Sequence, residues 1–165
     1  MSNKVNKYIL QLINNGIMET DDEFELFEDA IANLEDLVTI DDIPMLCKCL
    51  NDSTNEDEVM FGLIHLIEKF EDDRSIELIV QGVLEIIENT RGWSKILIKR
   101  ILNNDSARNV CGLVFEQLDT SSREIMIGVL EEIKCDNPKK FEEKVNFVLK
   151  RLKDVTTHYR DFSRE

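Results

Sequence analysis

Apolar residues recur along most of the chain at intervals of three and four positions. This spacing places apolar side chains on one face of an α-helix, whereas a half-buried strand needs strict alternation. No alternating run persists, so the pattern predicts an all-α protein of about nine helices. The helices are expected over residues 3–15, 20–38, 41–51, 58–70, 71–90, 93–103, 106–118, 121–133 and from 137 onwards.

Polar residues, glycine and proline mark where these helices begin and end. Residues 20–23, Thr-Asp-Asp-Glu, have the form of a capping box, whose side chains bond the first free N–H groups of a helix. Gly16 stands where a C-cap is expected, and Pro44 fits the first turn of the third helix. Asp105 and Thr120 are expected as N-caps of the seventh and eighth helices.

Taken in pairs, the predicted helices recur about every 30 to 35 residues, an interval typical of α-solenoid repeats. We therefore expect a HEAT-like right-handed stack of helical pairs. A compact irregular helical bundle is the alternative, because no repeat consensus is legible. The length suits one domain, so residues 1–165 are expected to form a single all-helical domain whose polar end, residues 154–165, frays.

The sequence also bears on compartment and redox state. The amino terminus lacks the apolar run and cleavage site of a signal peptide, and no segment approaches the roughly 20 apolar residues that cross a bilayer. We expect a soluble, cytoplasmic protein that does not enter a membrane. Cys47, Cys49, Cys111 and Cys135 lie mostly among apolar neighbours, which indicates reduced core thiols. The Cys47–Cys49 pair lacks the further ligands of a zinc site, so no metal is predicted.

Charge is distributed very unevenly along the chain. The net charge is −14, but residues 1–90 hold 5 basic and 22 acidic residues, a net of −17, whereas residues 91–165 hold 15 and 12, a net of +3. No Lys or Arg occurs between Tyr8 and Cys47. Such acidity argues against binding to nucleic acid, whose phosphates need cations, and favours a cationic partner.

Catalytic signatures are missing from the sequence. It contains no Gly-rich phosphate loop, no G-x-S-x-G and no H-E-x-x-H motif. His65 precedes Glu68 by three residues, so the two share a helical face, but a di-iron bundle would use the order Glu-x-x-His twice. We therefore interpret His65 as a hydrogen-bonded structural histidine and His158 as a solvated one. The sequence predicts no enzyme activity and no cofactor.

Two segments resemble a known family. They are EVMFGLIHLIEKF, residues 58–70, and GWSKILIKRILN, residues 92–103. The order and spacing of a helix that carries a histidine and a glutamate, followed by a Trp-containing helix that ends in Arg-Ile-Leu-Asn, are similar to the immunity protein 30 family of bacterial polymorphic toxin systems. The resemblance covers roughly residues 25–135 and is most specific over residues 93–103.

The resemblance implies a cytoplasmic antitoxin that binds and neutralises a cognate toxin domain, and the acidic half would complement the basic cleft of a nuclease. A HEAT-like interaction scaffold without an inhibitory role is the alternative. The sequence does not indicate an oligomeric state. Trp93, Arg100 and Asn103 are candidates for either a structural or a partner-binding role. The candidate partner-binding residues are Glu23, Glu25, Glu28, Asp29, Glu56, Asp57, Glu58, His65, Glu68, Asp72 and Asp73.

Overall fold

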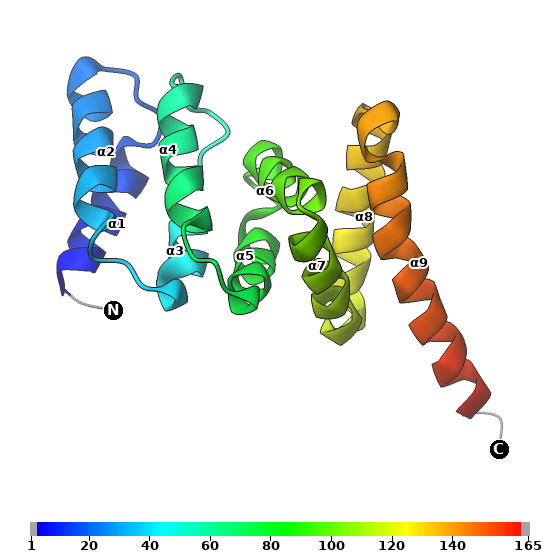
Figure 1. Ribbon diagram of the computed structural model, residues 1–165. Helices are drawn as coiled ribbons and strands as arrows, with labels where there is room; N and C mark the ends of the chain where they lie inside the picture. Colours follow the sequence, from blue (N-terminus) through cyan, green and yellow to red (C-terminus); the bar gives the residue numbers. More distant parts are fainter. Residues whose placement is uncertain (1–2, 163–165) are drawn as a thin grey trace. The chain divides into compact units, whose positions relative to one another are not determined.

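The computed structural model describes the backbone of residues 3–162 and the side chains of residues 3–152 (Figure 1). Within this part of the chain there are nine α-helices, one short 3-10 helix and no strand, so the predicted all-α class is confirmed. The elements are α1 (Asn3–Asn15), α2 (Asp21–Leu34), η1 (Ile40–Asp42), α3 (Ile43–Cys47), α4 (Asp57–Glu68), α5 (Asp73–Ile86), α6 (Arg91–Asn103), α7 (Asp105–Gln117), α8 (Thr120–Asp136) and α9 (Pro138–Phe162).

The helices form two compact units, residues 1–97 (unit 1) and residues 98–165 (unit 2). The boundary falls inside α6, so this helix contributes residues to both units. No helix in the described part of the chain is both long and apolar enough to cross a bilayer. The expectation of one domain, and that of a HEAT-like stack, stay predictions.

In unit 1, α1 and α2 form an antiparallel hairpin. Tyr8 of α1 donates a hydrogen bond to Asn33 of α2, and Gln11 donates to the carbonyl oxygen of Leu26. The α3 helix packs against α5, and α4 lies against both α2 and α3. The core between these helices is aliphatic and aromatic, and its largest fully buried side chains include Phe27, Leu34, Ile43, Leu46, Leu63 and Ile67.

The α2 and α4 helices run in the same direction. Lys69, just after α4, donates a hydrogen bond to the carbonyl oxygen of Glu35, just after α2. Their carboxyl ends are therefore adjacent, and Gly62 of α4 lies close to Ile31 of α2 midway along the contact. The first turns of both helices consequently lie at the same end of unit 1 (Figure 1).

In unit 2, α7 and α8 pack against α9, and arginines complete the ends of two helices. Arg108 donates to the carbonyl oxygen of Leu102 near the end of α6 (2.6 Å). Arg123 donates to the carbonyl oxygens of Phe115, Glu116 and Leu118 at the end of α7. Carbonyl groups in the last turn of a helix lack the usual partner four residues on, and a cation also suits the negative end of the helix dipole. Both arginines therefore have structural roles.

The predicted ends of the first and third helices are partly wrong. Gly16 does not adopt the left-handed conformation of a C-cap. Instead Met18 has a φ of 54°, and its N–H donates to the carbonyl oxygen of Asn15. The third helix ends at Cys47, earlier than the expected end near residue 51, because the chain turns there toward the loop of residues 48–56. Pro44 lies in the first turn, as predicted.

Two predicted N-caps are displaced by one residue. The N-cap of α7 is Asn104, whose side chain accepts from the N–H of Ala107, and the N-cap of α8 is Asp119, which accepts from the N–H of Ser122. In each case the earlier side chain can reach the N–H group three residues on, which is the geometry that a cap requires. The predicted cap residues Asp105 and Thr120 are the first residues of their helices.

The last helix, α9, extends over much of the segment expected to fray. The side chains from residue 153 onwards, His158 among them, and the backbone of residues 163–165 lie outside the described part of the chain. The expectation of fraying over residues 154–165 therefore stays a prediction.

Candidate functional site

The amino-terminal half of α2 carries a dense group of exposed carboxylates. Thr20 is the N-cap, and its hydroxyl accepts a hydrogen bond from the N–H of Glu23 (3.2 Å), as the capping-box pattern predicts. The Glu23 carboxylate accepts from the N–H of Glu19 (2.7 Å) rather than from that of Thr20. Carboxylates near the positive end of a helix are favourable, so the local sequence both starts the helix and concentrates negative charge there.

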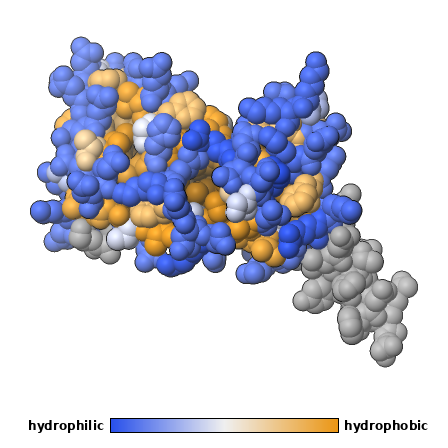
Figure 2. Space-filling model, in the orientation of Figure 1, coloured by the Kyte–Doolittle hydropathy of each residue, from blue (hydrophilic) through white to orange (hydrophobic). Residues whose placement is uncertain are grey.

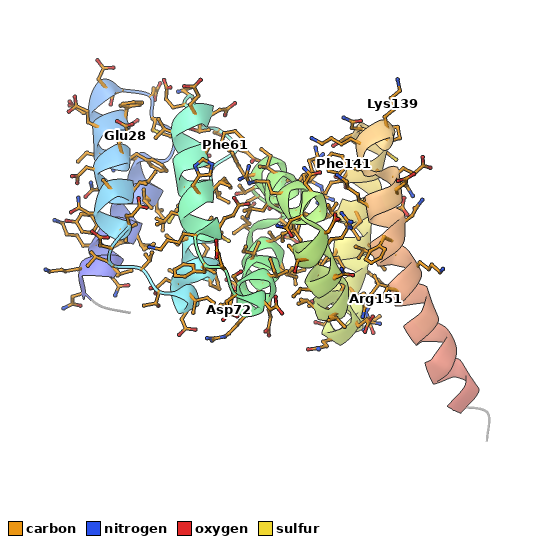
Figure 3. All side chains as sticks on the ribbon, viewed as in Figure 1. Glu28, Phe61, Asp72, Lys139, Phe141 and Arg151 are labelled. Atoms are coloured by element: carbon orange, nitrogen blue, oxygen red, sulfur yellow. The ribbon has the colours of Figure 1, made fainter. Side chains whose placement is uncertain are left out.

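A second group of carboxylates lies at the same end of unit 1, because α2 and α4 are parallel. Glu56, Asp57 and Glu58 are exposed at the start of α4. We call the two groups together the acidic end of unit 1, which comprises Asp21, Asp22, Glu23, Glu25, Glu56, Asp57 and Glu58. Glu28 and Asp29 continue along the exposed face of α2, and Figure 3 shows Glu28 projecting from that helix.

The carboxylates of α2 differ in how they are held. The Asp29 side chain accepts hydrogen bonds from the amides of Gln11 (3.3 Å) and Asn33 (3.0 Å). By contrast, Glu25 and Glu28 are exposed and make no hydrogen bond or ion pair with any residue that the structure describes. These two carboxylates, like those of Asp21 and Asp22, are therefore available to a partner without loss of an internal contact.

Asp72 and Asp73 do not join the acidic end. They stand at the start of α5, where Asp72 is the N-cap and accepts from the N–H of Arg74 (2.8 Å). The Arg74 guanidinium also pairs with Asp41 of η1 (2.5 Å). Figure 3 places Asp72 at the opposite end of unit 1 from the first turns of α2 and α4. The predicted partner-binding residues thus form two separate groups.

His65 and Glu68 lie on the outer side of α4. His65 is exposed, and among the described residues it makes no hydrogen bond or ion pair, so the interpretation as a hydrogen-bonded structural histidine is wrong. The reason is its place on the helix, since Ile64 and Ile67 turn inward while position 65 is rotated about 100° away from position 64. Glu68 is half-buried.

Trp93 is buried, with 4% of its surface exposed, as its position at the start of an amphipathic segment predicts. Its ring packs edge-to-face on Phe61 of α4, with ring centroids 5.1 Å apart. The role of Trp93 in the structure is therefore to join the start of α6 to α4 within unit 1.

Asp52 is a residue that the sequence did not single out, yet it organises the start of α6. Its carboxylate accepts hydrogen bonds from the N–H groups of Gly92 (2.7 Å) and Trp93 (3.0 Å). A Cβ atom at position 92 would lie 2.9 Å from an oxygen of the Asp52 carboxylate, so glycine permits this approach. In the sequence, only the Gly-Trp pair indicates that a carboxylate caps this helix, because the capping residue comes from a distant loop.

Arg100 and Asn103 belong to unit 2. Asn103 is exposed and accepts a hydrogen bond from Lys144 of α9 (2.6 Å), while Arg100 is half-buried. Lys99, Lys140 and Lys144 surround the ring of Phe141, each with its ammonium within 6.0 Å of the ring centroid. Figure 3 marks Phe141 on α9. Asn103 is thus connected to α9 through Lys144.

All four cysteines are free thiols, as predicted, but only three are buried. Burial raises the pKa of Cys47, Cys49 and Cys111 to about 12 in each case, since a thiolate would lose its hydration. Cys135 is exposed, which corrects the expectation for this position. Among the described residues, no group of His, Cys, Asp and Glu side chains has the arrangement of a metal site.

The charge difference between the two parts of the sequence corresponds closely to the two units. Unit 1 holds 22 acidic and 7 basic residues, a net charge of −15, whereas unit 2 holds 12 and 13, a net charge of +1. Several cations of unit 1 are engaged internally, among them Lys48 with Glu85 (2.7 Å). The face in Figure 2 shows blue hydrophilic residues over much of unit 1, interrupted by orange hydrophobic patches.

A family model described as Immunity protein 30 matches residues 14–111 of the chain. The matched region includes the acidic end, His65 and Glu68 of α4, and the whole of α6. No curated protein and no solved structure matched.

Proposed function

The chain belongs to the immunity protein 30 family, and from that premise we propose that it is an antitoxin that binds a cognate bacterial toxin domain and neutralises it. Its role is binding and not catalysis, and its place of action is the cytoplasm. The toxin belongs to a polymorphic toxin system, of the kind delivered between neighbouring cells by contact-dependent inhibition.

The observation that carries the proposal further is the acidic end of unit 1. Exposed carboxylates from two parallel helices gather at one place, and the unit around them has a net charge of −15. Such a surface complements a basic cleft and accelerates association with it. A nuclease cleft is basic because it binds phosphates, so a nuclease toxin is the partner that this surface fits best.

His65 fits the same proposal. It is an exposed imidazole on the outer face of α4, the helix whose first turn contributes to the acidic end. Imidazoles and carboxylates on one helix face offer both donors and acceptors to a partner. We include Glu25, Glu28, Glu56, Asp57, Glu58 and His65 in the proposed interface.

Co-expression tests the function directly. The chain should restore growth to cells that produce the toxin encoded beside it, and the purified proteins should form a complex. A HEAT-like scaffold without an inhibitory role would bind a partner without restoring growth, and that outcome would replace the antitoxin proposal by its alternative.

The acidic surface is tested by association kinetics. The variant Glu25→Gln/Glu28→Gln removes two charges that have no internal contact, so the fold should be retained. We expect slower association with the toxin at low salt and a weaker salt dependence than in the wild type, because steering depends on unscreened charge. The matched control is Glu142→Gln/Glu143→Gln on the exposed face of α9 in unit 2. Equal association rates for both variants and the wild type would remove α2 from the interface.

A further inference from the structure

Three large aliphatic side chains are exposed along one side of α1 and the turn that follows it. Leu10 is 58% exposed, Ile13 is 44% exposed and Ile17 is 46% exposed. Leu10 and Ile13 share one face of α1 at a spacing of three residues, and Ile17 follows in the turn beyond the end of the helix. We call these three residues the α1 stripe.

The neighbouring helix does not cover the α1 stripe. Tyr8 and Gln11 are the residues of α1 that bond α2, and Leu10 and Ile13 are rotated from them by about 100° or more around the helix axis. The core-facing side of α1 is a different one and carries Val5, Ile9 and Leu12, all of them buried. An isolated exposed leucine is ordinary, but a row of three aliphatic residues is the pattern of a contact surface.

Acidic residues are absent from the α1 stripe itself and begin at its end. Residues 3–18 contain no Asp or Glu, although they belong to the more acidic unit, and the exposed Lys4 and Lys7 precede the stripe. Carboxylates begin just beyond the end of the stripe, at Glu19 in the chain and at Glu56 in the loop. That loop is held against the stripe by a hydrogen bond from the N–H of Asn55 to the carbonyl oxygen of Ile17 (2.9 Å). An apolar row with charged residues at its borders has the apolar centre and polar rim of a protein–protein interface.

We propose that the α1 stripe is the apolar centre of the toxin-binding interface, and that the partner surface carries apolar side chains bordered by Lys or Arg. The inference rests on the proposed antitoxin function and names the part of the surface that holds the complex together. The acidic end attracts the partner through charge, which salt screens, and the stripe slows its dissociation through apolar burial, which salt does not screen.

A second copy of the chain fits the stripe less well than such a partner. Three half-exposed side chains fall far short of the roughly 800 Å² per partner that a stable interface buries, so the stripe needs further contacts around it. A pair of copies would also bring together two units that each have a net charge of −15, and like charges repel. A cationic border on the partner converts the same contacts into attraction.

The test compares two variants whose altered side chains are all exposed. Leu10→Gln/Ile13→Gln changes the stripe, and Leu113→Gln/Ile125→Gln is the matched control in unit 2, where the two side chains are 44% and 39% exposed. Circular dichroism and urea unfolding should show that both variants fold as the wild type does. We then expect the stripe variant to dissociate from the purified cognate toxin about tenfold faster at both low and high salt, with the control unchanged.

The possible outcomes are distinguishable. If the wild type binds the toxin and the stripe variant dissociates at the same rate, the inference is overturned and the antitoxin function stands. If the wild type does not bind the toxin, the antitoxin function is overturned and the inference with it. If light scattering shows that the wild type self-associates, that the stripe variant does not, and that toxin binding is equal, the stripe joins copies of this chain instead.

Discussion

The carboxylate of Asp52 caps the start of α6 from a loop that is distant in the sequence. It accepts hydrogen bonds from two N–H groups at the start of α6, forty positions along the chain or more. Those N–H groups have no partner within the helix, and an anion is also favoured at the positive end of a helix. The loop of residues 48–56 is thereby fastened to α6 within unit 1.

Removal of this cap should destabilise the protein. We expect Asp52→Ala to lower the free energy of unfolding by about 1 to 2 kcal/mol, the usual value of an N-cap, and Asp52→Asn to cost less because its amide oxygen still accepts. Urea unfolding measures the change, with Ser53→Ala as the control in the same loop. Identical midpoints for Asp52→Ala and the control would show that the cap contributes nothing.

The cysteines should differ sharply in reactivity. Only Cys135 is exposed, so a thiol reagent at pH 8 should modify one thiol rapidly in the native protein and all four after unfolding. The three buried thiols have pKa values raised to about 12. They therefore stabilise the fold below their unfolded pKa near 9, and that contribution should be lost as pH rises toward 12. Rapid modification of more than one native thiol would contradict this.

At the residue scale, the sequence predicts those features that depend on residues nearby in the chain. The burial of Trp93 follows from its amphipathic segment, and the Thr20 cap follows from the residues beside it. The role of Asp52 does not, because its partners are remote in sequence. The prediction that His65 is a hydrogen-bonded structural residue is wrong because apolar neighbours in the sequence need not be neighbours in space. Adjacent residues of a helix point in directions about 100° apart.

At the scale of helices, the contact between α4 and α6 depends on two aromatic rings. Trp93 and Phe61 meet edge-to-face, and Trp93 is almost fully buried. We expect Trp93→Ala to cost about 3 to 5 kcal/mol, the usual loss for a buried aromatic residue, and Phe61→Leu to cost less. The native protein should fluoresce at the short wavelengths of a buried indole. Emission at the wavelength of free tryptophan would refute the packing.

The sequence does not predict in which direction neighbouring helices run relative to one another. Periodicity identifies α2 and α4 as amphipathic helices. Their parallel direction, however, depends on η1 and α3, which lie between them in the chain, and on the hydrogen bond from Lys69 to a backbone carbonyl oxygen. That direction decides which carboxylates gather. It places the first turns of α2 and α4 at one end of unit 1 and leaves Asp72 at the other end, although the three acidic helix starts look alike in the sequence (Figure 3).

For the whole molecule, the all-α class was predictable because nearly every segment has a period close to 3.6 residues, and the charge asymmetry was visible from composition. The two units are expected to unfold together. We predict one cooperative transition, as expected for a single domain of this length. Trp93 reports on unit 1 and far-ultraviolet circular dichroism reports on all helices, so the two signals should change at the same urea concentration. A loss of helix that precedes the change in fluorescence would show that the units unfold separately.

The unit boundary inside α6 restricts where the genes of related proteins can recombine. A gene cut between the codons for Leu97 and Ile98 would fall within a helix and interrupt its backbone hydrogen bonds, and the family match over residues 14–111 also runs past this point. Recombination between relatives should therefore succeed at the turn of residues 87–90 or near Asn104, where α6 is kept whole. Crossovers at residues 97–98 should be rare among functional chimeras. The segment that a crossover has to leave intact is therefore α6, although its residues belong to two units.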